Sequence, residues 1–188
     1  MKKLSNILIL TLLFSVATSA QKTKIAVLKK LDSQSEKYGS IAMQIWNLAE
    51  MGYLEEQSSS LLQETLSNEG FTIKKGVANI PTAFIAEYGS GLPIIAILGE
   101  FDALPGLSQQ AIPEKKSANG NAGHACGHHL FGTASAAAAI SVKQWMQSTK
   151  QKGTIRFYGC PAEEGGGAKV YMAREGLFDD VDIALHWH

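Results

Sequence analysis

The sequence predicts an α/β fold, in which helices cover both faces of a mostly parallel central sheet to give a three-layer αβα domain. Strand-like and helix-like segments alternate along the chain, as they do in this class. Residues 93–98, PIIAIL, form a continuous apolar run of strand length, which is typical of a central strand buried on both faces. Polar clusters follow several predicted strands, and ligands bind at that edge of open α/β sheets.

The composition of the 188-residue chain is that of an ordinary globular protein. Hydrophobic residues make up 45%, and 17 Lys and Arg balance 17 Asp and Glu. Because the chain has neither a net charge nor a basic stripe with interleaved aromatic residues, we do not expect nucleic acid to be a partner.

The first 20 residues have the order of a signal peptide. Lys2 and Lys3 precede an apolar run at 7–16, and small residues lead to a cleavage site after Ala20. The run is too short for a membrane span, and the alternative is a buried N-terminal strand or helix. We therefore expect an exported protein, periplasmic or secreted, with residues 21–188 as its mature part.

The elements of the first half follow from periodicity and from turn residues. A polar lead-in at 21–31 precedes two predicted helices, at 32–49 and 55–68, the second of which ends at Gly70. The predicted strands are 71–73, 83–88 and 93–98. The third strand runs into Glu100 and Asp102, which places two carboxylates at its carboxyl end.

The second half begins with a polar loop at 107–120 and the histidine-rich stretch 121–129. Residues 130–147 are rich in alanine and are predicted to form a helix that lies close to the sheet. The remaining predicted elements are a strand at 154–158, a short helix at 168–175 and a strand at 183–187.

The stretch 121–129, NAGHACGHH, concentrates metal-binding side chains. In an extended segment Cys126 and His128 point to the same side, because they are two residues apart. A thiolate and an imidazole suit zinc and other first-row metals rather than calcium or magnesium. A disulfide with Cys160 is the alternative in an exported protein, but it would remove this ligand, so we rank metal binding above it. Cys160 is assigned to packing.

Glu163 and Glu164 lie in the second polar stretch, CPAEEGGG at 160–167. Adjacent glutamates are usually a charged surface pair, but these follow an apolar strand and precede three glycines. One carboxylate could bind metal while its neighbour acts as a general base. Zinc lowers the pKa of a bound water to about 7, and the base would pass the water's proton to the departing amine.

The third polar stretch is His186-Trp187-His188. In a strand these two histidines face the same side, so both could face the site or both the layer that covers the sheet.

Four segments together resemble the zinc-dependent aminoacylase/carboxypeptidase superfamily of amidohydrolases: 81–91, 99–110, 123–139 and 153–182. The resemblance implies two divalent metal ions, zinc first, with manganese, nickel or cobalt as alternatives. It implies hydrolysis of the amide bond of an N-acyl amino acid such as p-aminobenzoyl-glutamate, through a metal-bound hydroxide.

By position, the resemblance makes four residues metal ligands: Cys126, His128, Glu164 and His188. Glu163 would be the general base and acid, and Asp102 would not be a ligand. The remaining imidazoles stay open between a supporting role around the metals and a structural one: His124, His129 and His186.

Members of this superfamily continue past a segment of this length into a lid and dimerisation domain, and they then supply another ligand histidine. We therefore expect residues 21–188 to be the N-terminal part of a catalytic domain, without the lid. The complete protein would form a homodimer or pair with a related subunit. One alternative is a truncated, non-catalytic relative that binds a metal or an amino acid. A thiol redox protein is disfavoured, because Cys126 and Cys160 do not form a C-x-x-C pair.

Overall fold

A computed structural model describes residues 23–188, so the predicted signal peptide at 1–20 lies outside the described residues. The chain divides into two compact units, residues 1–36 and 37–188. In the first unit, residues 23–32 form a helix, in the segment that the sequence identifies only as a polar lead-in. Among residues 23–188, no helix has both the length and the apolar character that crossing a bilayer requires.

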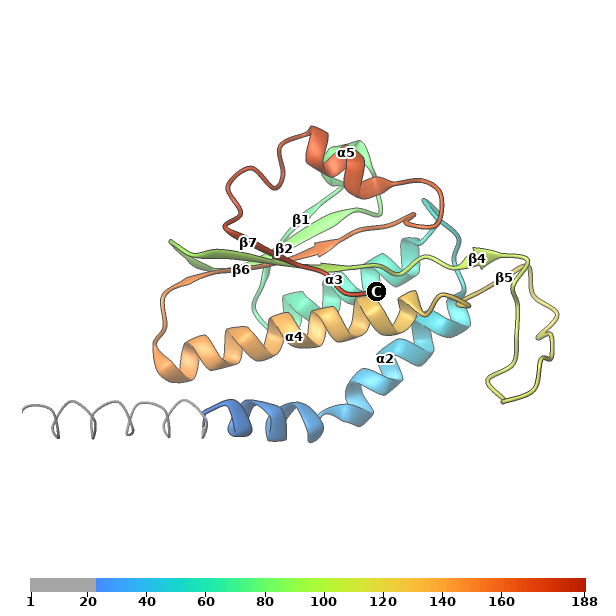
Figure 1. Ribbon diagram of the computed structural model, residues 1–188, viewed down its shortest axis with the longest axis horizontal. Coiled ribbons are helices and arrows are strands. Elements are labelled where there is room, and N and C mark those ends of the chain that lie inside the picture. The colour runs from blue at the N-terminus through green and yellow to red at the C-terminus, as the bar shows by residue number, and fades with distance from the viewer. Residues whose placement is uncertain (1–22) are drawn as a thin grey trace, which may run out of the picture. The chain divides into compact units, whose positions relative to one another are not determined.

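The second unit is built on a five-stranded sheet with the strand order β1-β2-β6-β3-β7 (Figure 1). The strands are β1 (Thr72–Lys75), β2 (Phe84–Ser90), β3 (Ile94–Gly99), β6 (Gly153–Gly159) and β7 (Ile183–Leu185). β3 pairs in parallel with β6 and β7, whereas β2 runs antiparallel to both β6 and β1. Four of the five strands therefore point the same way, which confirms the mostly parallel sheet.

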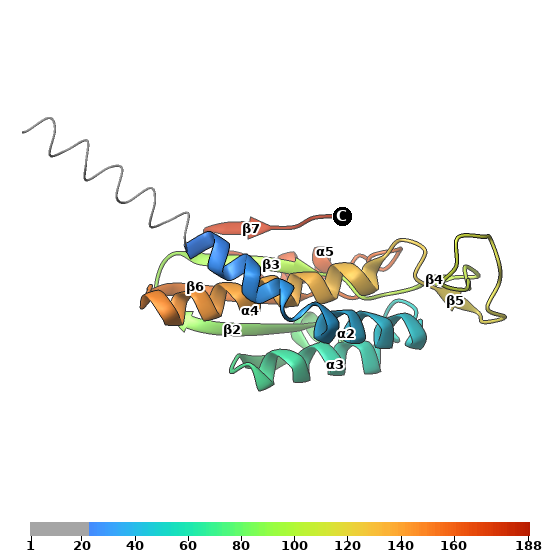
Figure 2. The same ribbon diagram turned by 90° about the horizontal axis from the view of Figure 1, so that it is seen from below.

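Helices cover both faces of this sheet, as the sequence predicts. α3 (Glu56–Asn68) and α4 (His128–Thr149) lie on one face together with α2 (Ser35–Leu48), and α5 (Ala168–Arg174) lies on the other (Figures 1 and 2). The polar loop between β4 (Leu104–Pro105) and β5 (Ala122–Gly123) extends away from the sheet. The three layers place the carboxyl ends of β3 and β6 beside the start of α4.

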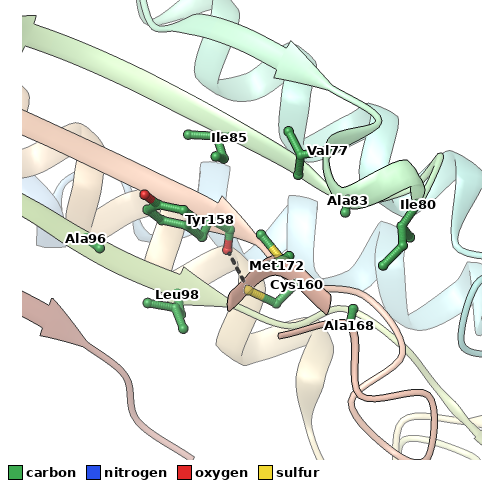
Figure 3. Packing of buried hydrophobic residues seen from close by; sticks show 10 residues of the cluster. All are labelled: Val77, Ile80, Ala83, Ile85, Ala96, Leu98, Tyr158, Cys160, Ala168 and Met172. Atoms are coloured by element: carbon green, nitrogen blue, oxygen red, sulfur yellow. Dashed lines mark hydrogen bonds between the residues drawn. The ribbon is translucent and has the colours of Figure 1, made fainter. Parts of the chain in front are cut away.

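The layer under α5 is filled by one apolar cluster that includes Cys160 (Figure 3). Its buried members come from β2, β3, β6, α5 and their connections: Val77, Ile80, Ala83, Ile85, Ala96, Leu98, Tyr158, Cys160, Ala168 and Met172. Cys160 and Cys126 are both free thiols. Burial raises the pKa of Cys160 to about 12, so this thiol stays neutral and packs as a small apolar side chain.

On the opposite face, small residues bring α4 against β3. A Cβ atom added to Gly132 would lie 2.3 Å from the carbonyl oxygen of Glu100, which belongs to the backbone and cannot turn aside. We expect Gly132→Ala to push α4 away from the sheet and to lower the free energy of unfolding by about 1–3 kcal/mol. Urea denaturation measures this change.

Gly39→Ala in α2 is the matched control for that substitution. Gly39 is exposed, and a Cβ atom there would meet nothing within 4 Å. Because alanine favours a helix over glycine by up to about 1 kcal/mol, we expect this variant to be as stable as the wild type or more so. An equal loss of stability in the two variants would contradict the close approach of α4.

Candidate metal centre

The histidine-rich loop turns into α4 earlier than the sequence predicts. Gly127 is the N-cap of α4 with φ of +89°, in the left-handed region that favours glycine, so the helix begins at His128 rather than at residue 130. The prediction of an extended C-x-H segment is therefore wrong. The turn at Gly127, rather than an extended backbone, carries Cys126 and His128 to the same place.

Three side chains from two distant parts of the chain meet there. The Nε2 atom of His188, just beyond β7, lies 3.5 Å from Sγ of Cys126 and 3.2 Å from Nε2 of His128. One ligand atom from each of these residues lies within 4.8 Å of those of the other two. The structure thus brings together Cys126, His128 and His188, which are three of the four residues that the resemblance makes metal ligands.

Asp102 fixes which nitrogen of His128 faces this group. The Nδ1 atom of His128 lies 2.9 Å from Oδ1 of Asp102, and the other carboxylate oxygen accepts the backbone N–H of Glu164 at 3.0 Å. Burial opposes the ionisation of Asp102, but these hydrogen bonds lower its pKa. Because the carboxylate of Asp102 can only accept a hydrogen bond, Nδ1 of His128 donates it, and Nε2 is the ring nitrogen that is directed at the cluster.

Three carboxylates surround the same Nε2 atom of His128. It lies 3.1 Å from Oε2 of Glu100, 3.7 Å from Oε2 of Glu163 and 3.8 Å from Oε1 of Glu164. The first of these carboxylates is fully buried, whereas the side chains of Glu163 and Glu164 are 34% and 22% exposed. A second group of donor atoms within 4.8 Å of one another is Glu100, His128, Glu163 and His188.

The donor atoms fit a divalent metal ion. Lone pairs of imidazole and carboxylate converge at short distances, and such atoms repel one another unless a proton or a cation lies between them. Burial, followed by a hydrogen bond with Glu164 and the charges of Glu164 and Glu163, raises the pKa of Cys126 to about 11, so this thiol ionises at neutral pH only with a cation beside it. Thiolate, imidazole and carboxylate together are a ligand set for zinc and related metals.

Glu100 is the site residue that the sequence reasoning missed. Its Oε1 accepts hydrogen bonds from Lys169 and from Nε2 of His186, the latter at 3.0 Å. Its Oε2 has no hydrogen-bond partner among the described residues and faces Nε2 of both His128 and His188. The signal was its position after β3, where the predicted strand ends in two carboxylates. His186 contacts this carboxylate and belongs to neither group of donor atoms.

His124 and His129 lie in a packed layer beside the site. The ring of His129 is 5.0 Å from that of His124 and 4.9 Å from that of Trp46, and Nε2 of His124 lies 3.0 Å from the carbonyl oxygen of Ile45. Burial lowers the pKa of both histidines, that of His129 to about 4, so both rings are neutral at pH 7. Their contacts indicate a structural role in joining α2 to the start of α4.

The second half of the chain matches a known family, and most of the chain resembles known proteins. A family model described as peptidase family M20/M25/M40 matches residues 96–188. The chain is 52% identical over 160 residues to a subunit of the p-aminobenzoyl-glutamate hydrolase of Escherichia coli K12, and the match covers 84% of this chain and 33% of that protein. It is 28% identical to the Xaa-Arg dipeptidase of Mus musculus, over 93% of this chain and 40% of that protein.

A solved structure shows the same fold. The Bacillus subtilis YXEP protein, described as a dinuclear metal binding peptidase from the M20 family, superposes with a TM-score of 0.72 at 24% sequence identity. The match covers 84% of this chain and 43% of that one. The chain thus spans about a third to two fifths of the length of the two curated relatives.

Proposed function

Because the chain belongs to peptidase family M20/M25/M40, we propose that it is part of a metal-dependent amidohydrolase that cleaves the amide bond of N-acyl amino acids. The observation that carries this proposal is the gathering of donor atoms around His128 at the carboxyl end of β3: the thiol of Cys126 and the imidazole of His188 on one hand, and three carboxylates within 3.8 Å of its Nε2 atom on the other. The convergence favours a catalytic role over a non-catalytic binding role, because a carboxylate that could serve as a base lies beside the donors.

In this proposal the metal ligands are Cys126, His128, Glu164 and His188. The buried Glu100 adds a negative charge that offsets the charge of the cations. We propose two divalent ions, of which zinc suits the thiolate best, with manganese, nickel or cobalt as alternatives. When bound, such ions polarise a carbonyl oxygen and make water acidic enough to ionise near neutral pH.

Glu163 would move the proton during hydrolysis. Its carboxylate lies at the edge of the cluster, with 34% of the side chain exposed, so water and substrate can reach it. As the oxygen of water bonds to the carbonyl carbon, Glu163 takes its proton, and it gives that proton to the amine nitrogen as the C–N bond breaks. The products are a free amine and a carboxylic acid, which then loses its remaining proton to the solvent, and Glu163 returns to its starting state.

We propose p-aminobenzoyl-glutamate as the first substrate to test, because the 52% identical relative is named for its hydrolysis. That relative is named as one subunit of its enzyme, which supports a related subunit as partner and leaves a homodimer as the alternative. The order of charged, apolar and small residues at 1–20 supports export to the periplasm or the medium.

Removal of divalent ions with a chelator is expected to abolish hydrolysis of p-aminobenzoyl-glutamate by the complete protein. The release of p-aminobenzoate measures the reaction. Zinc should restore it, and parallel additions of manganese, nickel and cobalt identify the metal that supports the highest rate. Full turnover by the metal-free protein would refute the proposal. A protein that holds metal but hydrolyses no N-acyl amino acid would instead be a non-catalytic relative.

A further inference from the structure

We propose that residues 52–55 clamp the turn that carries Glu163 and Glu164, and that Glu55 is a positioning residue for both. The inference rests on the proposed function, because it assigns to Glu55 a part in placing the base and a ligand. Glu55 lies at the start of α3 and is separated from the turn by more than 100 residues of sequence.

The turn has a backbone conformation that its own sequence does not favour. Ala162, directly before Glu163, has φ of +53°. The left-handed region disfavours any residue that carries a Cβ atom, so contacts from the surroundings must hold Ala162 there.

Glu55 supplies one such contact from a fully buried position. Its Oε1 accepts the backbone N–H of Ala162 at 2.8 Å, and its Oε2 accepts the hydroxyl of Thr82 at 3.2 Å. Both carboxylate oxygens therefore have a partner. Burial of a carboxylate costs free energy unless its oxygens accept hydrogen bonds. Here one oxygen accepts the hydrogen bond from the residue directly before Glu163 and Glu164.

The position of Glu55 in α3 supports this role. Glu55 is the N-cap residue of α3, yet its side chain makes no capping hydrogen bond. Glu50 caps the helix instead, since its carboxylate accepts the backbone N–H groups of Gln57 at 3.0 Å and Ser58 at 2.8 Å. The side chain of Glu55 is thus left for the turn rather than for its own helix.

Gly52 and Tyr53 pack closely against the same turn. A Cβ atom on Gly52 would lie 3.0 Å from Cα of Ala162, and one on Gly166 would lie 2.4 Å from the ring of Tyr53. The hydroxyl of Tyr53 donates to the carbonyl oxygen of Gly166 at 2.6 Å. Residues 52–55 therefore contact the turn on both sides of the two glutamates.

The turn is also anchored directly at its second glutamate. The backbone N–H of Glu164 donates to Asp102, the residue that orients His128. Glu163 accordingly lies between two hydrogen-bonded anchors, Ala162 on Glu55 and Glu164 on Asp102. Loss of the first anchor would leave every donor group present but would free the base and its neighbour to shift. A small misplacement of this kind can lower a rate by about 10²-fold.

Three variants of the complete protein test the clamp. We expect Glu55→Ala to lower kcat by about 10²-fold with little change in KM, and to weaken zinc binding about 10–100-fold. Glu55→Gln keeps an oxygen that can accept the N–H of Ala162, so it should retain most of the wild-type kcat and zinc affinity. Glu50→Ala removes the cap of α3 but no contact with the turn, so it should lower thermal stability and leave kcat and zinc affinity near those of the wild type.

Hydrogen exchange of residues 160–167, followed by mass spectrometry, gives a readout that does not depend on activity. Exchange there should be faster in Glu55→Ala than in Glu50→Ala. If Glu55→Ala does not fold, Gly52→Ala, whose Cβ would press on Ala162, replaces it with the same expectations.

Two results would overturn the clamp while leaving the proposed function intact. The first is wild-type kcat, zinc affinity and exchange in a folded Glu55→Ala or Gly52→Ala protein. The second is an equal loss of kcat in Glu50→Ala, which would trace the effect to stability alone. A wild-type protein that neither binds zinc nor hydrolyses N-acyl amino acids would overturn both proposals.

Discussion

Replacing Glu163 with glutamine is expected to lower kcat for amide hydrolysis by about 10²–10⁴-fold, with the fold and metal content of the wild type retained. Glutamine has nearly the shape of glutamate but cannot take a proton from water at neutral pH. Oε2 of Glu163 lies 3.7 Å from Nε2 of His128, at the edge of the cluster. Because glutamine fills the same space, the substitution removes the base without opening a cavity.

Steady-state kinetics with p-aminobenzoyl-glutamate, together with metal analysis of the same preparation, measure the two parts of this expectation. Glu64→Gln, an exposed position on α3, is the control for the change of charge. A wild-type kcat in Glu163→Gln would show that Glu163 is not the general base. If metal is lost in proportion to activity, Glu163 is a ligand, which its place among the second group of donor atoms would explain.

Replacing His128 with phenylalanine is expected to weaken metal binding by more than about 10²-fold, since changes to residues that only support a ligand already cost about 10–100-fold. His128 belongs to both groups of donor atoms, so its loss affects every ion held there. Phenylalanine keeps a ring of similar size at a fully buried position but offers no lone pair. Hydrolysis should fall together with metal content.

The neighbouring His129→Phe is a matched control, because it makes the same substitution one residue later in α4. His129 is buried against Trp46, and its Nδ1 has no hydrogen-bond partner among the described residues, so an apolar ring should be accepted there. Zinc titration of both variants by calorimetry measures the difference. Equal zinc affinity in the two would show that His128 is not a ligand.

Much of the fold could be predicted from the sequence because its signals are local. The apolar run at 93–98 became β3, and Gly70 ended α3, since burial on both faces and a left-handed glycine each leave a pattern within a few residues. The start of α4 was misplaced, because propensity predicts which residues extend a helix but not that Gly127 would turn the chain into one at His128.

The site could be predicted only in part, because some of its residues are defined by distant partners. Cys126 and Glu163 stand in unusual local stretches and could be singled out without the fold. Glu100 could not be given a role, since its contacts, Lys169 and His186, lie 69 and 86 residues further along the chain. Glu55, whose partner Ala162 is 107 residues away, leaves no local pattern at all.

The metal content of the purified protein tests the central claim most directly, which is that these donors hold divalent ions. After equilibration with zinc and removal of the excess, elemental analysis should find two ions per chain. With cobalt in place of zinc, a thiolate-to-cobalt absorption band should appear and should vanish in Cys126→Ala. A folded protein that retains no stoichiometric metal, and shows no such band, would contradict the account.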